Sequence, residues 1–246
     1  MNESMVKRYT AVMGEKLTAD ELINKPLILS QREKLSVRIV SGKRILDIGC
    51  LFGDVSAATA SNNSKNYVIA IDRYIDHVNI AAHRFKYLPN LAFCQGNVYD
   101  LGFKDEYFDS ILFLEVIEHL THPVKALQEI NRVLTMNGQL VISTYNAFYW
   151  KHLVKLLLGR YNLSMYQEDV EWSRHIFCWT LDTLYTLLRE NGFDLKGYQF
   201  LGLGLIPENS RLGRWSEEIF RRLASRFGNT MILECLKVSP PTGRII

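Results

Sequence analysis

The chain has 246 residues, of which 48% are apolar and 22% charged, and its formal net charge is +3. These values are typical of a globular protein with one large buried core, and they exclude a disordered or fibrous chain. So small a net charge gives no support for nucleic-acid binding. The cysteines form no Cys-x-x-Cys pair, so neither a disulfide framework nor a zinc knuckle is expected.

The chain shows neither a secretion signal nor a membrane-spanning segment. Residues 1–13 are polar and lack the apolar core of a secretion signal. No stretch approaches the ~18 uninterrupted apolar residues of a membrane-spanning helix. We therefore expect a cytoplasmic protein without a transmembrane segment.

Residues 1–43 are expected to form an N-terminal helical cap. Ser30 and Glu33 have the spacing of a capping box, which predicts the start of a helix. Ser41 and Gly42 predict the end of that helix, because glycine is common just beyond a helix C-terminus. The cap therefore ends immediately before the first strand-like run.

From residue 44 onward, apolar strand-like runs alternate with helical stretches. The expected strands are 44–48, 67–71, 91–95, 109–115 and 139–144, and the expected helices between them are 55–61, 75–88 and 123–136. Apolar strands separated by helices of this length predict a parallel sheet covered on both faces, which is a doubly wound α/β fold. We assign residues 44–145 to this core.

The pattern changes after the fifth strand. The expected elements are an amphipathic helix with lysines at 147–158, a helix at 180–191, a strand at 193–201, a helix at 214–227 and a last strand at 230–238. We expect a single domain of residues 1–246, in which 146–215 forms the lid, the substrate region and the sixth strand, and 216–246 the last helix and strand. Periodicity alone leaves the pairing of the last two strands open.

A glycine turn follows the first strand and is the most informative motif of the chain. Asp47 ends an apolar run, and Gly49, Cys50 and Gly53 follow it before a helix of small residues. The spacing is neither Gly-x-Gly-x-x-Gly nor a P-loop, and an acid at this place would repel a pyrophosphate. The motif favours a cationic nucleoside ligand, although a tight strand-to-helix connection would leave the same pattern.

Polar residues also end the next strands. Asp72 and Arg73 end the second strand, Asn97 and Val98 follow the third, and Glu115 ends the fourth. In a doubly wound sheet, ligands bind outside the carboxyl ends of the strands. Asp72 could instead cap the following helix, and Asn97 could be a turn residue. Their joint order favours one ligand site.

These motifs resemble those of class I S-adenosylmethionine-dependent methyltransferases. The residues that carry the resemblance are Asp47-x-Gly49-Cys50-x-x-Gly53, Asp72, Gly96-Asn97, and the block from Tyr107 through Glu115-x-x-Glu118-His119. The resemblance implies S-adenosylmethionine as the cofactor and a mostly parallel seven-stranded sheet whose last strand is antiparallel. It also implies that the Gly49–Gly53 turn holds the methionine moiety, Asp72 the ribose, and Asn97 with Val98 the adenine. Arg73 and Glu115 complete the expected cofactor set.

Two positions depart from the pattern of that family. Leu51 stands where a glycine is common in the turn, and Asn97 replaces the commoner aspartate. An amide oxygen accepts a hydrogen bond from an amine as a carboxylate does, so Asn97 remains compatible with an adenine site.

Glu118 and His119 are the expected catalytic residues. At positions i, i+3 and i+4, Glu115, Glu118 and His119 could share one face of a helix, and His119 titrates in the range that suits a general base. The block also resembles those of metal-using ubiquinone-biosynthesis O-methyltransferases and small-RNA 2′-O-methyltransferases, with His175 as a further candidate ligand. A divalent metal is possible on this pattern, but we favour a site without one.

The expected function is methyl transfer to an oxygen, or else a nitrogen, of a small-molecule acceptor. The alternatives are a metal-dependent RNA 2′-O-methyltransferase and a non-catalytic cofactor-binding subunit. We expect no nucleic-acid partner, and a monomer or a homodimer.

Overall fold

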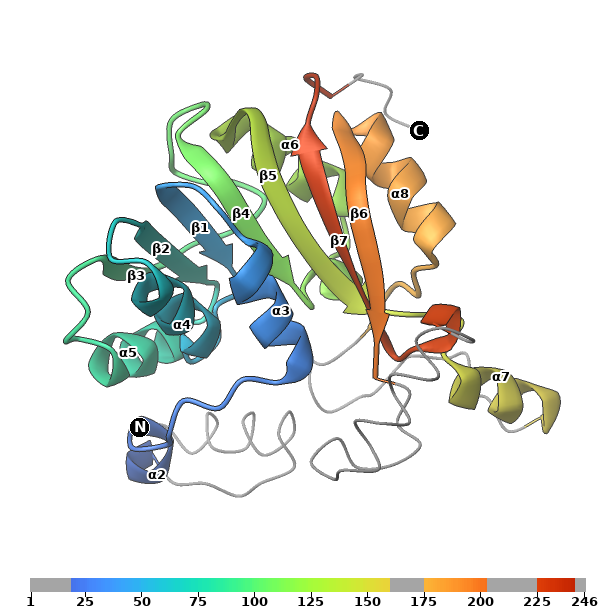
Figure 1. Cartoon of the computed structure of the whole chain (residues 1–246), viewed down its shortest axis with the longest axis horizontal. Helices are drawn as coiled ribbons and strands as arrows, with labels where there is room; N and C mark the ends of the chain where they lie inside the picture. The colour runs from blue at the N-terminus through green and yellow to red at the C-terminus, as the bar shows by residue number, and fades with distance from the viewer. Residues whose placement is uncertain (1–18, 160–174, 203–224, 242–246) are drawn as a thin grey trace.

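The computed structural model describes residues 19–159, 175–202 and 225–241, and its centre is a seven-stranded sheet in the order β3-β2-β1-β4-β5-β7-β6 (Figure 1). The strands are β1 (Arg44–Ile48), β2 (Tyr67–Asp72), β3 (Leu91–Gln95), β4 (Phe108–Leu114), β5 (Leu134–Tyr145), β6 (Phe193–Leu201) and β7 (Thr230–Lys237). The first five are parallel, and β7 is antiparallel to both of its neighbours, β5 and β6. The doubly wound fold and its antiparallel last strand are confirmed.

Seven α-helices and two short 3-10 turns are described. They are α2 (Ala19–Ile23), α3 (Gln31–Ile39), α4 (Asp54–Asn62), α5 (Ile75–Arg84), α6 (Pro123–Val133), α7 (Trp150–Leu157), α8 (Leu181–Glu190), η1 (Ile117–His119) and η2 (Ser225–Phe227). The predicted capping box is present at the start of α3. The Glu33 amide donates to Ser30 Oγ at 3.3 Å, and the Ser30 amide donates to Glu33 Oε2 at 2.7 Å.

The core has two apolar layers, one on each face of the sheet. Successive strand residues point to opposite faces, so Ile111 and Phe113 of β4 belong to one layer and Leu112 to the other. Ile130 of α6 packs in the first layer with residues of α8, and Leu35 of α3 packs in the second with residues of α4. Parallel strands buried on both faces read as continuous apolar runs, which explains the clarity of the strand pattern in the sequence.

Two predicted helices end earlier than expected. The helix expected at 75–88 ends at Arg84, and that expected at 123–136 ends at Val133. In the second case, Leu134 pairs with Phe108 and begins β5, so residues expected in the helix belong to the sheet instead. The expected helix at 214–227 lies outside the described residues up to position 224.

The N-terminal segment lies against the turn that follows β1. Leu22 of α2 is 1% exposed and packs with Phe52. Arg84 donates to the carbonyl oxygens of Lys25 at 3.1 Å and Phe52 at 2.8 Å, and it forms an ion pair with Asp54 at 2.7 Å. This arginine therefore ties three separate segments together.

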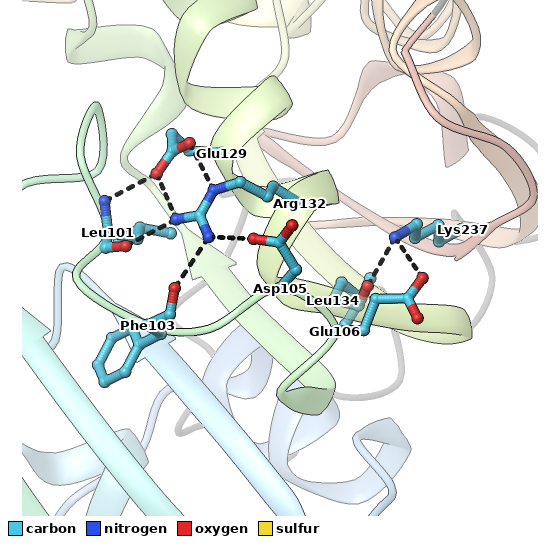
Figure 2. Close-up of polar contacts among 8 residues, drawn as sticks. All are labelled: Leu101, Phe103, Asp105, Glu106, Glu129, Arg132, Leu134 and Lys237. Carbon is cyan, nitrogen blue, oxygen red and sulfur yellow. Dashed lines mark hydrogen bonds and ion pairs between the residues drawn. The ribbon is translucent and has the colours of Figure 1, made fainter.

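Arg132 of α6 holds the loop between β3 and β4 (Figure 2). Its guanidinium donates to the carbonyl oxygens of Leu101 at 2.7 Å and Phe103 at 2.8 Å. It also pairs with Asp105 at 2.7 Å and with Glu129 at 2.8 Å. These hydrogen bonds raise the pKa of Arg132 and lower that of Glu129. The loop that carries Asn97 and Val98 is thus fixed at its far end.

Lys237 makes a second polar contact on the same side of the sheet (Figure 2). It is only 4% exposed, and its Nζ donates to the Leu134 carbonyl at 2.8 Å and to Glu106 Oε1 at 3.3 Å. A buried ammonium is tolerated when it is paired and hydrogen-bonded, so this lysine fastens β7 to the start of β5.

Candidate active site

The turn after β1 requires glycine at position 49. Gly49 has φ +79°, and a Cβ there would lie 2.5 Å from Val116 Cγ2. The amides of Gly49 and Cys50 both donate to the carbonyl of Ile71, at 2.8 and 3.0 Å. The turn is therefore pressed between the ends of β2 and β4.

The other positions of the turn have equally specific geometry. Gly53 has φ +81°, and a Cβ there would lie 2.7 Å from the ring of Phe93. Leu51, which departs from the family pattern, also has a positive φ of +50°, a conformation that is strained for a residue with a side chain. Its amide donates to Asp72 Oδ2 at 3.0 Å, which helps to hold it there.

Asp72 ends β2 and faces this turn. Its carboxylate accepts hydrogen bonds from the amides of Leu51 and Tyr74, the second at 2.9 Å, and its Oδ1 lies 3.1 Å from His77 Nδ1. The His77 ring is 4% exposed and makes edge contacts with Phe52 and Tyr74, with ring centroids 5.2 Å apart in each case. Tyr74, not Asp72, is the N-cap of α5, so the carboxylate is not a helix cap.

Asp47 lies beneath the turn and is 2% exposed. Burial raises its pKa to about 7, although Ser56 Oγ donates to it at 2.5 Å and so favours the charged form. A buried carboxyl group of this kind gains from a nearby positive charge. The arrangement is compatible with the cationic ligand expected from the sequence.

The expected adenine residues have different surroundings. Val98 is buried in the core, while Asn97 is exposed and its Oδ1 accepts from the Tyr99 amide at 3.1 Å. The Asn97 side chain therefore closes a local turn, and this hydrogen bond sets the orientation of its side-chain amide group. Arg73 is also exposed, and its guanidinium lies 5.1 Å from the centre of the Tyr74 ring.

Glu115 stands at the end of β4 with a positive φ of +54°. Its carboxylate forms an ion pair with Arg32 at 3.1 Å and accepts from Ser143 Oγ at 3.2 Å. Burial nevertheless raises the pKa of Glu115. No motif or spacing in the sequence pointed to Arg32 or Ser143 as partners of Glu115. The capping box located the start of α3, but only the fold brings its first turn to Glu115.

Glu115, Glu118 and His119 do not share a helical face, so that part of the sequence interpretation is wrong. The Glu115 amide donates to the Ser143 carbonyl at 2.9 Å, which holds this residue, one position beyond β4, against β5. Only Ile117–His119 forms a short 3-10 turn. Glu115 still lies close enough to Glu118 to raise its pKa, whereas His119 clusters with Glu118 and His175.

Glu118, His119 and His175 form a compact cluster. One potential ligand atom from each lies within 4.8 Å of the other two. Glu118 is 1% exposed, and within the described residues neither carboxylate oxygen has a hydrogen-bond partner. Burial and the neighbouring Glu115 raise the pKa of Glu118, whereas burial and the adjacent His119 lower that of His175 to about 4.

Main-chain bonds bring His175 to this cluster from a distant part of the sequence. The amides of Ile176 and Phe177 donate to the Glu118 carbonyl at 2.7 and 3.2 Å. The Tyr145 ring lies against His175, with centroids 4.5 Å apart. The exposed side chains of Ile176 and Phe177 add apolar surface next to the cluster.

The fold and this arrangement place the chain in a known class. Residues 39–192 match the family model described as a methyltransferase domain, which spans more than half of the chain. The chain therefore belongs to the class I S-adenosylmethionine-dependent methyltransferases, and it is an enzyme of that class. Within the described residues, no helix is long and apolar enough to cross a membrane.

Two curated relatives narrow the comparison to small-molecule methyltransferases. The ubiquinone biosynthesis O-methyltransferase of Roseobacter denitrificans is 28% identical over 174 residues, covering 69% of this chain and 68% of the relative. The demethylmenaquinone methyltransferase of Clavibacter sepedonicus is 28% identical over 187 residues, covering 70% of this chain and 74% of the relative.

Solved structures share the fold at lower identity. A SAM-dependent methyltransferase of Thermotoga maritima has a TM-score of 0.62 and 16% identity, with 95% of this chain and 99% of that chain covered. The [4+2]-cyclase SpnF has a TM-score of 0.61 and 17% identity, with 95% of each chain covered. At such identities the likeness concerns the fold, and function has to be argued from the site.

Proposed function

We propose that this enzyme transfers a methyl group to an oxygen atom of a small-molecule acceptor, with His119 as the general base. The observation that carries the proposal is the cluster of Glu118, His119 and His175 at the same sheet edge as the glycine turn. The relative named an O-methyltransferase supports the choice of oxygen.

The cofactor would lie along the carboxyl ends of β1 to β4. Asp72 would accept hydrogen bonds from the ribose hydroxyls, and Asn97 with Val98 would contact the adenine. The ion pair of Glu115 and Arg32 offers one charge of each sign, which suits the ammonium and carboxylate of a methionine moiety. Arg32 thereby joins the cofactor set proposed from the sequence.

His119 would take the proton of the acceptor hydroxyl as its oxygen gains the methyl group. Bound S-adenosylmethionine supplies that methyl group from a sulfonium, which leaves as a neutral thioether. The pKa of His175 is lowered to about 4, so this neighbour stays neutral and adds no positive charge beside the base. The remaining contribution is to hold the acceptor in line and keep water out.

A metal-assisted form of the reaction is a second candidate, because the residues fit a divalent ion. Glu118 presents two buried oxygens without a partner among the described residues, and His119 and His175 are close enough to complete a three-residue set. Carboxylate and imidazole ligands of this number are typical of catalytic zinc sites. Such an ion would act as a Lewis acid on the acceptor oxygen.

The cofactor site is tested by calorimetry with S-adenosylmethionine. Asp72→Ala should abolish measurable binding, because the ribose loses its acceptor. Asp76→Ala, a partly buried carboxylate in the first turn of α5, serves as the matched control and should bind normally. Unchanged affinity in Asp72→Ala would refute the site.

The reaction is tested by measuring S-adenosylhomocysteine formation with catechol and with aniline. We expect turnover of catechol alone. His119→Ala should lower kcat by about 10²–10⁴-fold with little change in cofactor affinity, as expected for loss of a general base. Turnover of aniline in preference to catechol would contradict an oxygen acceptor.

A further inference from the structure

Helix α7 presents an unusual number of aliphatic side chains to water. The exposed fractions are 44% for Val154, 53% for Leu156, 86% for Leu157 and 63% for Leu158. No residue of this helix is buried. Scattered exposed leucines are ordinary, but four exposed aliphatic side chains within residues 154–158, on α7 and its C-cap, indicate a surface that something covers.

The base of α7 is firmly held while the rest of it projects. The Asn146 side chain donates to the carbonyls of Arg226 and Gly228 at 2.8 Å and accepts from the Phe148 amide at 3.0 Å. Tyr149, the residue before the helix, is only 9% exposed. Beyond this anchor, α7 extends away from the sheet, past the carboxyl end of β5 (Figure 1).

The charges of α7 have one sign. Lys151 and Lys155 lie one helical turn apart and are both exposed, and residues 146–160 contain no aspartate or glutamate. Trp150 stands at the start of the helix, where an aromatic ring suits the boundary between water and lipid. A leucine-rich face flanked by lysines is typical of helices that lie in a membrane interface.

We propose that α7 docks the enzyme on an anionic membrane surface, with Val154, Leu157 and Leu158 entering the boundary between headgroups and acyl chains. The helix has 8 residues, far fewer than the ~20 needed to span a bilayer, so it lies on the surface. A protein partner is less well matched, because aromatic and arginine anchors dominate protein interfaces and leucine contributes less. This docking does not depend on the identity of the methyl acceptor.

Vesicle flotation of the full chain tests the proposal. We expect binding to vesicles of phosphatidylcholine with phosphatidylglycerol, and weaker binding to phosphatidylcholine alone. The double variant Leu157→Gln with Leu158→Gln keeps good helix formers and should lower binding by about tenfold or more, since it removes apolar burial. Lys155→Gln should reduce the dependence on phosphatidylglycerol.

Tyr87→Gln is the matched control, because Tyr87 is also exposed, at 68%, but lies beyond α5. It should bind vesicles like the unaltered chain. Failure of the unaltered chain to float with anionic vesicles would overturn the proposal. A lower melting temperature in the double leucine variant would show that α7 packs on its own chain, and a smaller particle in light scattering would show that it packs on a second copy. Either result would also overturn membrane docking.

Discussion

The Nδ1 atom of His77 lies 3.1 Å from Oδ1 of Asp72, and both side chains are almost completely buried. The histidine comes from α5, while the aspartate ends β2, so His77 contacts one carboxylate oxygen and the Leu51 amide donates to the other. The His77 ring is itself held between Phe52 and Tyr74. Packing sets the position of the His77 ring, and the contact of that ring with Asp72 in turn restricts the orientation of the carboxylate.

His77→Gln should therefore weaken S-adenosylmethionine binding without removing it. Loss of one hydrogen bond to a charged group costs roughly 1.5–3 kcal/mol, or about ten- to a hundredfold in Kd. Calorimetry gives the affinity directly. His83→Gln, on the exposed side of the same helix, is the control. If both variants bind equally well, His77 has no part in positioning Asp72.

Gly49→Ala should destabilise the fold and remove cofactor binding. The added Cβ would lie 2.5 Å from Val116 Cγ2, and the positive φ adds strain of about 1–3 kcal/mol. Thermal unfolding followed by circular dichroism measures the effect. Gly102→Ala is the matched control, because a Cβ there meets nothing within 4 Å. Equal melting temperatures for the two variants would contradict the tight turn.

If a divalent ion binds the Glu118 cluster, Glu118→Gln and His175→Ala should each weaken Zn²⁺ binding by about tenfold or more. Titration of Zn²⁺ into the metal-free chain provides the measurement. His122→Ala, at an exposed position outside the cluster, should bind as the unaltered chain does. Absence of Zn²⁺ binding in the unaltered chain would leave the metal-free reaction as the only candidate.

The titration of Asp47 makes stability depend on pH. Burial raises the pKa of Asp47 to about 7, whereas an aspartate in an unfolded chain has a pKa of about 3.9. Between these values the folded chain holds a proton that the unfolded chain has lost. This group therefore lowers the free energy of unfolding as the pH rises through the window.

Asp47→Asn keeps an acceptor for Ser56 Oγ and removes the titration. Urea unfolding at about pH 5 and about pH 7 should show a smaller loss of stability in Asp47→Asn, by at most about 2 kcal/mol. The same loss in both proteins would mean that Asp47 remains charged throughout this range.

The sheet and the strand ends could be predicted because their signals are local. Expected strands 44–48, 91–95 and 193–201 coincide with β1, β3 and β6, since turn or loop residues mark both ends of each. In a parallel sheet the carboxyl ends share one edge, so residues such as Asp47 and Asp72 could be placed together before the fold was known.

Contacts between distant segments could not be predicted in the same way. Arg32 reaches Glu115 only because α3, which packs on one face of the sheet, brings its first turn to the end of β4, and no spacing in the sequence encodes that placement. The left-handed backbone conformation of Glu115, at the bend just beyond β4, likewise has no signal in the sequence. For this reason the expectation that Glu115, Glu118 and His119 share a helical face is wrong. His175, named as a candidate ligand from the sequence, does lie beside Glu118 and His119.

The position of β7 between β5 and β6 affects how the protein is made. Among the described strands, β6 pairs with β7 alone, so during synthesis it emerges from the ribosome before the strand that attaches it to the sheet. Until Thr230–Lys237 follows, β5 presents an open edge, and such an edge can pair with the wrong chain. The β5 edge can therefore be closed by β7 only after residues 230–237 have been made.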